Sequence, residues 1–172
     1  WEAKYDHEVL SNGPAEIAVK FRYVSQDKGI PQVAGILVEK MIALREDDRT
    51  VKVTVRLTNT ASKGKYAGYW LQNICWLGGD KEGDQYFRPS KRGLSQISSD
   101  EDKSPDGGFV REPQAGWTAA IDGKTQTGLV WFMDYNQLWF LYNCTPASTI
   151  EWQDDAVAIP AGKSWETQVT MI

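Results

Sequence analysis

Hydrophobic and polar residues alternate along several segments of this chain with the two-residue period of a β-strand. Every second position is aliphatic or aromatic between residues 15 and 24, and the same holds between residues 50 and 59. Successive side chains of a strand point to opposite faces, so each segment predicts a half-buried strand with one apolar face. The predicted inward positions are Ile17, Val19, Phe21, Tyr23, Val51, Val53, Val55 and Leu57.

Further short apolar or alternating segments follow one another, separated by turn-forming residues. Residues 11–14 and 122–123, for example, carry strong turn signals. About a dozen short strands and no helix are predicted, which is the pattern of a sandwich or barrel. The serine- and acid-rich segment 94–108 is predicted to be a mobile loop. The other predicted strands cover residues 1–10, 33–44, 66–77, 109–113, 116–121, 128–133, 138–144, 148–152 and 165–172.

These strands predict an all-β fold, an antiparallel two-sheet β-sandwich of the supersandwich or jelly-roll type. The length of 172 residues is that of one domain, so a single β-sandwich domain is predicted over residues 1–172. Because the sequence begins at Trp1 rather than Met, we expect a mature form or a domain cut from a longer protein.

The predicted strand 66–77 carries the most informative pattern. Alternation places Trp70, Gln72, Ile74 and Trp76 on one face, and mostly core-forming residues on the other. Two indoles beside a neutral amide suit a sugar, which has apolar C–H faces and many hydroxyl groups. The alternative is that the tryptophans fill a second buried face, because large aromatic residues dominate cores.

Residues that follow this strand add further candidates. The glycine-acid turn 78–84 offers Asp80, Glu82 and Asp84 as oxygen ligands for calcium, and a solvated turn is the alternative. No other cofactor is predicted. The candidate sugar contacts beyond this turn are Tyr86, Arg88 and, in the aromatic segment 138–144, Trp139. A structural salt bridge is the alternative role of Arg88.

Composition narrows the function classes. The net charge of −4 is scattered along the chain, which argues against nucleic acid as a partner, and no apolar run is long enough to span a membrane. A single histidine, His7, excludes a metal centre built from several histidines. Cys75 and Cys144 are expected to be free thiols or one disulfide. Eight Trp and seven Tyr are a load typical of β proteins that handle carbohydrates.

Several segments together resemble the galactose-mutarotase-like supersandwich superfamily, namely residues 35–44, 51–60, 69–73 and the ending 159–167. The resemblance implies a β-sandwich with a strand facing a sugar cleft. Enzymes of that superfamily use histidines and a glutamate around the ring oxygen of the sugar. Here Gln72, not a histidine, stands on the cleft-facing strand, which puts epimerase chemistry in doubt.

The leading hypothesis is a non-catalytic carbohydrate-binding module that recognises a polysaccharide or oligosaccharide by aromatic stacking and neutral hydrogen bonds. We expect it to be secreted or periplasmic and to be linked covalently to a catalytic domain. The alternative is an enzyme like a sugar epimerase or a polysaccharide lyase, or a fragment of one. Glycoside hydrolysis needs two facing carboxyl groups, and the spacing of the candidates selects no pair among Glu112, Asp134, Glu151 and Asp154.

Overall fold

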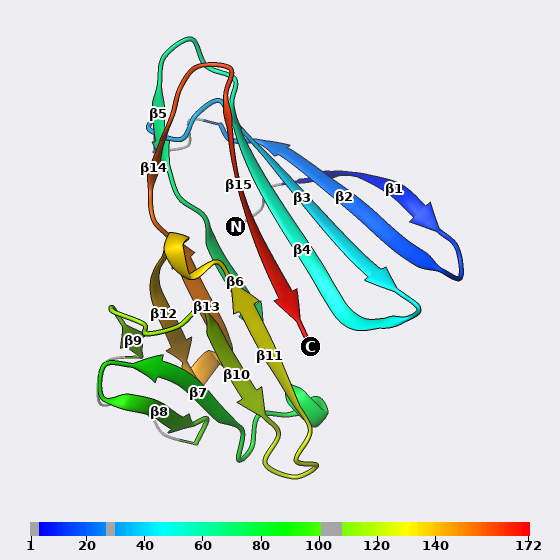
Figure 1. Ribbon diagram of the computed structural model, residues 1–172, viewed down its shortest axis with the longest axis vertical. Coiled ribbons are helices and arrows are strands. Elements are labelled where there is room, and N and C mark those ends of the chain that lie inside the picture. The colour runs from blue at the N-terminus through cyan, green and yellow to red at the C-terminus, as the bar shows by residue number, and fades with distance from the viewer. Residues whose placement is uncertain (1–3, 27–29, 101–107) are drawn as a thin grey trace. The chain divides into compact units, whose positions relative to one another are not determined.

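The computed structural model describes residues 4–26, 30–100 and 108–172 (Figure 1). Within these residues the chain forms strands and three short 3-10 turns, at Leu77–Gly79, Tyr135–Gln137 and Thr145–Ala147, and no α-helix. Every strand pair whose register is established is antiparallel, which confirms the predicted all-β antiparallel sandwich class. The chain divides into two compact units, residues 69–155 and the remainder, so the single domain stays a prediction.

The first unit is built from the two ends of the chain. One antiparallel sheet has the order β1-β2-β3-β4-β15, and these strands lie side by side in Figure 1. A short β5-β14 pair belongs to the same unit. The strands are β1 (Asp6–Asn12), β2 (Glu16–Val24), β3 (Ile36–Arg45), β4 (Asp48–Asn59), β5 (Lys65–Ala67), β14 (Val157–Ile159) and β15 (Ser164–Met171).

The predicted alternation is confirmed in β4. Val53, Val55 and Leu57 are buried, whereas Arg56 between them is exposed. His7 lies on β1, at the edge of its sheet, opposite Phe21 of β2. The local two-residue period was therefore enough to assign the faces of β4. In β2 it was not, because Ile17, predicted to face inward, is exposed, whereas Ala18 on the opposite face is buried.

The second unit contains strands of two sheets. One has the order β11-β10-β7-β8 and the other β6-β13-β12-β9. Their strands are β6 (Trp70–Ile74), β7 (Gln85–Ser90), β8 (Gly93–Ser98), β9 (Phe109–Val110), β10 (Trp117–Ile121), β11 (Gly128–Met133), β12 (Leu138–Cys144) and β13 (Thr149–Asp154). The core of the unit is made by large side chains of both sheets, including Tyr86, Trp131, Leu141, Ile150 and Trp152.

Two predicted elements differ from the structure. The predicted strand 66–77 is divided, because β5 pairs with β14 whereas β6 pairs with β13. The predicted loop 94–108 begins instead with strand β8, because residues 93–98 pair with β7 across a tight turn. The polar composition of β8 hid this strand from a reading based on apolar positions. Residues 101–107 of the predicted loop lie outside the described residues.

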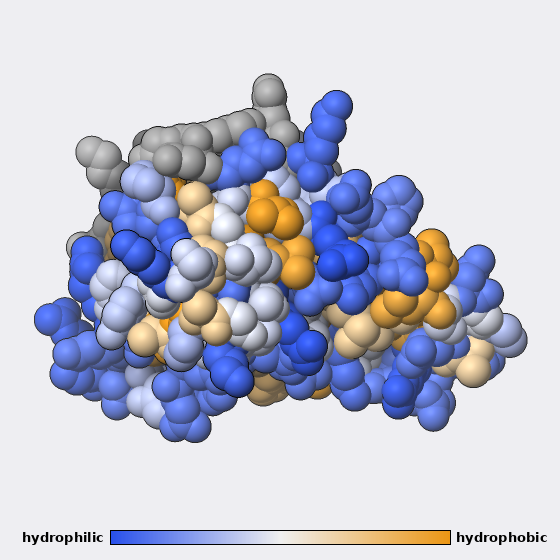
Figure 2. Space-filling model, turned by 90° about the horizontal axis from the view of Figure 1, so that it is seen from above, coloured by the Kyte–Doolittle hydropathy of each residue, from blue (hydrophilic) through white to orange (hydrophobic). Residues whose placement is uncertain are grey.

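No helix in the described part of the chain is long and apolar enough to cross a membrane. Figure 2 shows a mainly hydrophilic surface on which the visible hydrophobic residues gather in separate patches. Exposed aromatic side chains nevertheless occur, and three of the tryptophans are about half exposed or more: Trp70, Trp76 and Trp139.

Candidate functional site: an aromatic face around Glu151

The register of the β6-β13-β12-β9 sheet brings one row of side chains together. Gln72 of β6 lies opposite Glu151 of β13, which lies opposite Tyr142 of β12, which lies opposite Phe109 of β9. In the next row, Trp70 lies opposite Gln153, and Gln153 lies opposite Phe140. We call this surface the aromatic face and define it by Trp70, Gln72, Phe109, Trp139, Phe140, Tyr142 and Glu151.

Strand β6 places its side chains as the sequence predicted. Leu71 is buried, whereas Trp70, Gln72 and Ile74 on the opposite side are exposed. Strand β13 differs from a half-buried strand, because Thr149 and Glu151 are buried on the aromatic face while Ile150 and Trp152 are buried on the other. The aromatic face is therefore close-packed even though it lies outside the core of the unit.

Glu151 is the electrostatic centre of this face. Its carboxylate accepts hydrogen bonds from Trp70 Nε1 at 2.7 Å, from Gln72 Nε2 at 2.9 Å and from Thr149 Oγ1 at 2.6 Å. The side chain is only 4% exposed. A nearly buried carboxylate is stable when donors satisfy its oxygens, and here three neutral side chains do so.

Phe140 is the packing centre of the aromatic face. Its ring lies 5.3 Å from the ring of Trp70, 5.3 Å from that of Phe109 and 5.2 Å from that of Trp139. The ring centroids of Phe109 and Tyr142 lie 4.3 Å apart. Edge-to-face and tilted contacts of this length are favourable between aromatic rings. A register irregularity in β12 between Leu138 and Phe140 accompanies the position of Trp139 beside this cluster.

The aromatic face presents surface to solvent at two indoles. Trp70 is 49% exposed and Trp139 is 48% exposed, and both rings contact Phe140. Gln72 uses its amide nitrogen on Glu151, so its amide oxygen is the group left to accept a hydrogen bond from a ligand. Rigid aromatic surface and an oriented neutral acceptor suit a polyhydroxylated ligand.

Sequence reasoning identified Trp70, Gln72 and Trp139 but missed what holds them. Phe140 and Tyr142 alternate within segment 138–144, which was a sign of a shared face. Glu151 was noted only as an acid with no selected partner. Its position between Ile150 and Trp152 was a signal, because an unpaired buried charge is costly. Its three donors could not be identified, since two of them lie about 80 residues away along the chain.

Tyr86 and Arg88 are not part of the aromatic face, and this corrects their predicted role as sugar contacts. Both side chains are 0% exposed and lie in the core of the second unit. Arg88 donates from Nη1 to the Gly108 carbonyl at 2.7 Å and from Nη2 to Ser95 Oγ at 3.0 Å. These bonds give Arg88 a structural role, close to the alternative that its sequence context left open. Trp76 is 64% exposed and lies beyond the end of β6.

The three acids of the glycine-acid turn do not face a common point. Lys124 Nζ lies 2.8 Å from Asp80 Oδ2 and 3.1 Å from Glu82 Oε2, so a lysine neutralises both. Asp84, by contrast, is completely buried. No three histidine, cysteine or acidic side chains of the described residues gather as a metal-binding group. The calcium site at these three residues remains a prediction. Cys75 and Cys144 are free thiols.

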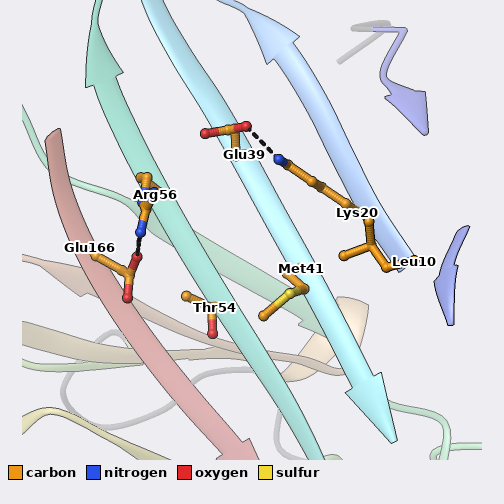
Figure 3. A pocket seen from close by; sticks show the side chains of 7 residues that line it. All are labelled: Leu10, Lys20, Glu39, Met41, Thr54, Arg56 and Glu166. Atoms are coloured by element: carbon orange, nitrogen blue, oxygen red, sulfur yellow. Dashed lines mark hydrogen bonds and ion pairs between the residues drawn. The ribbon is translucent and has the colours of Figure 1, made fainter. Parts of the chain in front are cut away.

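A separate groove of about 210 Å³ lies on the sheet of the first unit (Figure 3). Lys20 pairs with Glu39 at 3.0 Å and Arg56 pairs with Glu166 at 2.8 Å, so its charged groups already have partners. Its other lining residues, Leu10, Met41 and Thr54, include no aromatic ring. The aromatic face is therefore the better candidate for a sugar.

Of the comparisons with known proteins, the one with solved structures shows the fold of this chain. No family model matches the sequence, and no curated protein is similar to it. Among solved structures, it is similar to a putative aldose 1-epimerase from Klebsiella pneumoniae, with a TM-score of 0.60 and 13% identity over 97% of this chain and 53% of that one. A galactose mutarotase related enzyme from Lactobacillus acidophilus gives a TM-score of 0.57 and 12% identity, over 96% of this chain and 70% of that one.

A third similar structure is the GH36 α-galactosidase AgaB from Geobacillus stearothermophilus, with a TM-score of 0.61 and 11% identity over 99% of this chain and 27% of that one. The chain thus spans about half of the putative epimerase and about a quarter of the galactosidase. These likenesses establish a galactose-mutarotase-like fold, as the sequence motifs implied. At such low identity they show the fold alone.

Proposed function

We propose that this protein binds a polysaccharide or oligosaccharide on the aromatic face without cleaving it. The observation that carries the proposal is the fixed, half-exposed indole of Trp70, tied to buried Glu151 and packed edge-on against Phe140. A ring that is already ordered loses little conformational entropy when a ligand stacks on it. Trp139 provides a second such ring beside the same phenylalanine.

The burial and the hydrogen bonds of Glu151 favour binding over catalysis. A general acid or base must exchange a proton with the substrate and so must reach it. The Glu151 carboxylate is 4% exposed and both its oxygens accept hydrogen bonds from neighbouring side chains. It is therefore suited to hold Trp70 and Gln72 in position rather than to contact the reacting atoms.

An enzyme of the sugar-epimerase or polysaccharide-lyase kind is the second candidate. A single observation favours it, namely that the Glu151 carboxylate lies at the centre of the aromatic face, opposite Tyr142. Catalysis would require Gln72 or Trp70 to release Glu151 when the substrate binds. A covalently linked catalytic domain and a secreted or periplasmic location belong to the binding hypothesis as further expectations.

Affinity electrophoresis against a panel of soluble polysaccharides tests the proposal, with assay of released reducing ends and of unsaturated lyase products in parallel. We expect retardation by at least one glycan and no products. Trp70→Ala and Trp139→Ala should each weaken binding about five- to tenfold, on the scale of one aromatic contact. Tyr66→Ala is the matched control, because Tyr66 is an exposed aromatic residue of the first unit.

Unchanged retardation of both folded tryptophan variants would refute the proposed face. Accumulation of products that is lost in Glu151→Gln would favour the enzyme instead. Trp76→Ala belongs in the same series, because the sequence grouped Trp76 with Trp70 and its exposed side chain keeps that contribution testable.

A further inference from the structure

Two buried carboxylates lie side by side at one end of the second unit. Gln85, the first residue of β7, is opposite Ile121, the last residue of β10, so Asp84 and Asp122, one residue beyond these strand ends, are the next cross-strand neighbours. Asp84 is 0% exposed and Asp122 is 2% exposed. Like charges directly opposite each other in a sheet are destabilising, and burial increases the cost.

Asp122 is held in its charged form by the loop that follows it. Its Oδ1 accepts a hydrogen bond from the Lys124 amide at 2.9 Å, and its Oδ2 accepts one from Thr125 Oγ1. The Thr125 hydrogen bond, followed by those of the loop amides, lowers the pKa of Asp122. Gly78 packs directly against this carboxylate, because a Cβ at that position would overlap Asp122 Oδ2.

Asp84 is in the opposite situation. No hydrogen bond of normal geometry reaches either of its carboxylate oxygens, although the Gly123 amide is near enough to exert a small opposing effect. Asp84 is completely buried and has the Asp122 carboxylate as its cross-strand neighbour. A buried carboxylate with so little hydrogen bonding is rare in folded proteins and calls for a counter-charge or a proton.

Neutral oxygen groups surround this position as well. The hydroxyl groups of Tyr86 and Ser148 are both buried, and they interact with each other. The Tyr86 hydroxyl interacts with the Ser148 hydroxyl and with the Asp84 carboxylate, so the three groups lie in one neighbourhood. Lys124, the cation of this loop cluster, is directed outward to Asp80 and Glu82.

We propose that Asp84 and Asp122 bind a calcium ion inside this end of the second unit, with the hydroxyls of Tyr86 and Ser148 as neutral oxygen ligands. Calcium accepts carboxylate and neutral oxygens in flexible geometry, and its two positive charges match the two buried carboxylates. The site is independent of the proposed function, because none of its residues belongs to the aromatic face. Of the three acids in the glycine-acid turn, this site uses only the inward-facing Asp84, and not the exposed Asp80 and Glu82.

Thermal unfolding of the intact chain, with excess calcium and with chelator, tests the site. For wild type we expect a midpoint roughly 5–10 °C higher at calcium 100-fold above its Kd. Asp84→Asn and Asp122→Asn should each abolish the calcium-dependent shift. Asp80→Asn is the matched control, since it removes an acid of the same turn that faces Lys124, and it should retain the shift.

Direct binding keeps the test decisive if a variant fails to fold. Terbium bound to wild type should show luminescence sensitised by nearby aromatic rings, and calcium should displace it. Equal midpoints in calcium and chelator, together with a higher midpoint of Asp84→Asn at pH 7, would mean that Asp84 carries a proton and would overturn the proposal. Loss of the shift in Asp80→Asn but not in Asp84→Asn would overturn it too, by placing the ion on the surface turn.

Discussion

Trp70 Nε1 donates a 2.7 Å hydrogen bond to the Glu151 carboxylate across 81 residues of sequence. The bond joins a half-exposed ring to a nearly buried charge, and each group needs the other. The carboxylate gains a donor that offsets its burial, and the indole gains a fixed orientation. The binding surface of this fold therefore depends on an interaction that lies beneath it.

Glu151→Gln should destabilise the protein, although the change is nearly isosteric. Glutamine must turn an NH2 group toward at least one of the three donors that now face the carboxylate. We expect the free energy of unfolding to fall by about 1–3 kcal/mol, measured by urea denaturation. Glu112→Gln, at an exposed acid, is the control. Equal losses in the two variants would mean that the Glu151 hydrogen bonds contribute nothing specific.

Phe140→Ala should lower stability most strongly among the aromatic residues of the face. Phe140 is 5% exposed and contacts three rings, so its removal leaves a cavity at the centre of the cluster. The expected cost is about 3–5 kcal/mol, compared in denaturant unfolding with Phe132→Ala at a half-exposed position. A loss below that of Phe132→Ala would show that Trp70 and Trp139 do not depend on Phe140.

Arg88→Lys should reduce stability and leave glycan binding unchanged. Lysine cannot reproduce the forked donation to the Gly108 carbonyl and Ser95 Oγ. The expected loss is about 1–3 kcal/mol, measured by chemical denaturation beside the exposed control Arg92→Lys. Affinity electrophoresis of the folded variant provides the second measurement. Weakened glycan binding at full stability would restore Arg88 to the ligand site.

Cys75 should be the slower of the two cysteines to react. Burial raises the pKa of its thiol to about 11, with a further contribution from the Asp84 charge, so little thiolate is present at pH 8. Iodoacetamide should modify half-buried Cys144 at least tenfold faster, as followed by mass spectrometry. Comparable rates would show that the Cys75 environment opens readily in the native state.

The raised pKa of Cys75 should also make the stability of the protein depend on pH. Because the folded-state pKa of Cys75 lies above its ordinary value of 9.0, its contribution to stability is complete below pH 9 and is lost as the pH rises through about 11. The free energy of unfolding should therefore fall between these values, and Cys75→Ala should remove that part of the decrease. An unchanged pH profile in Cys75→Ala would assign the effect to other groups.

The sequence by itself determined the strands and their faces where a residue's neighbours along the chain were sufficient. The period of two fixed the buried Val53–Val55–Leu57 series of β4 and the exposed side of β6. Alternation is a local property of extended backbone, so it can be read without knowing which strands pair. The mutarotase-like motifs likewise indicated the fold that the solved structures share.

Only the tertiary structure decided what those faces meet. It placed Glu151 against Trp70 and Gln72, enclosed Tyr86 and Arg88 in the core, and turned Asp84 inward while Asp80 remained at the surface. Each outcome depends on strand partners and loop paths distant in sequence, and a one-residue change of register would reverse the faces. Whether a polar side chain stabilises the core, holds a neighbouring residue in position or binds a ligand depends on the donors and charges that strand pairing places beside it.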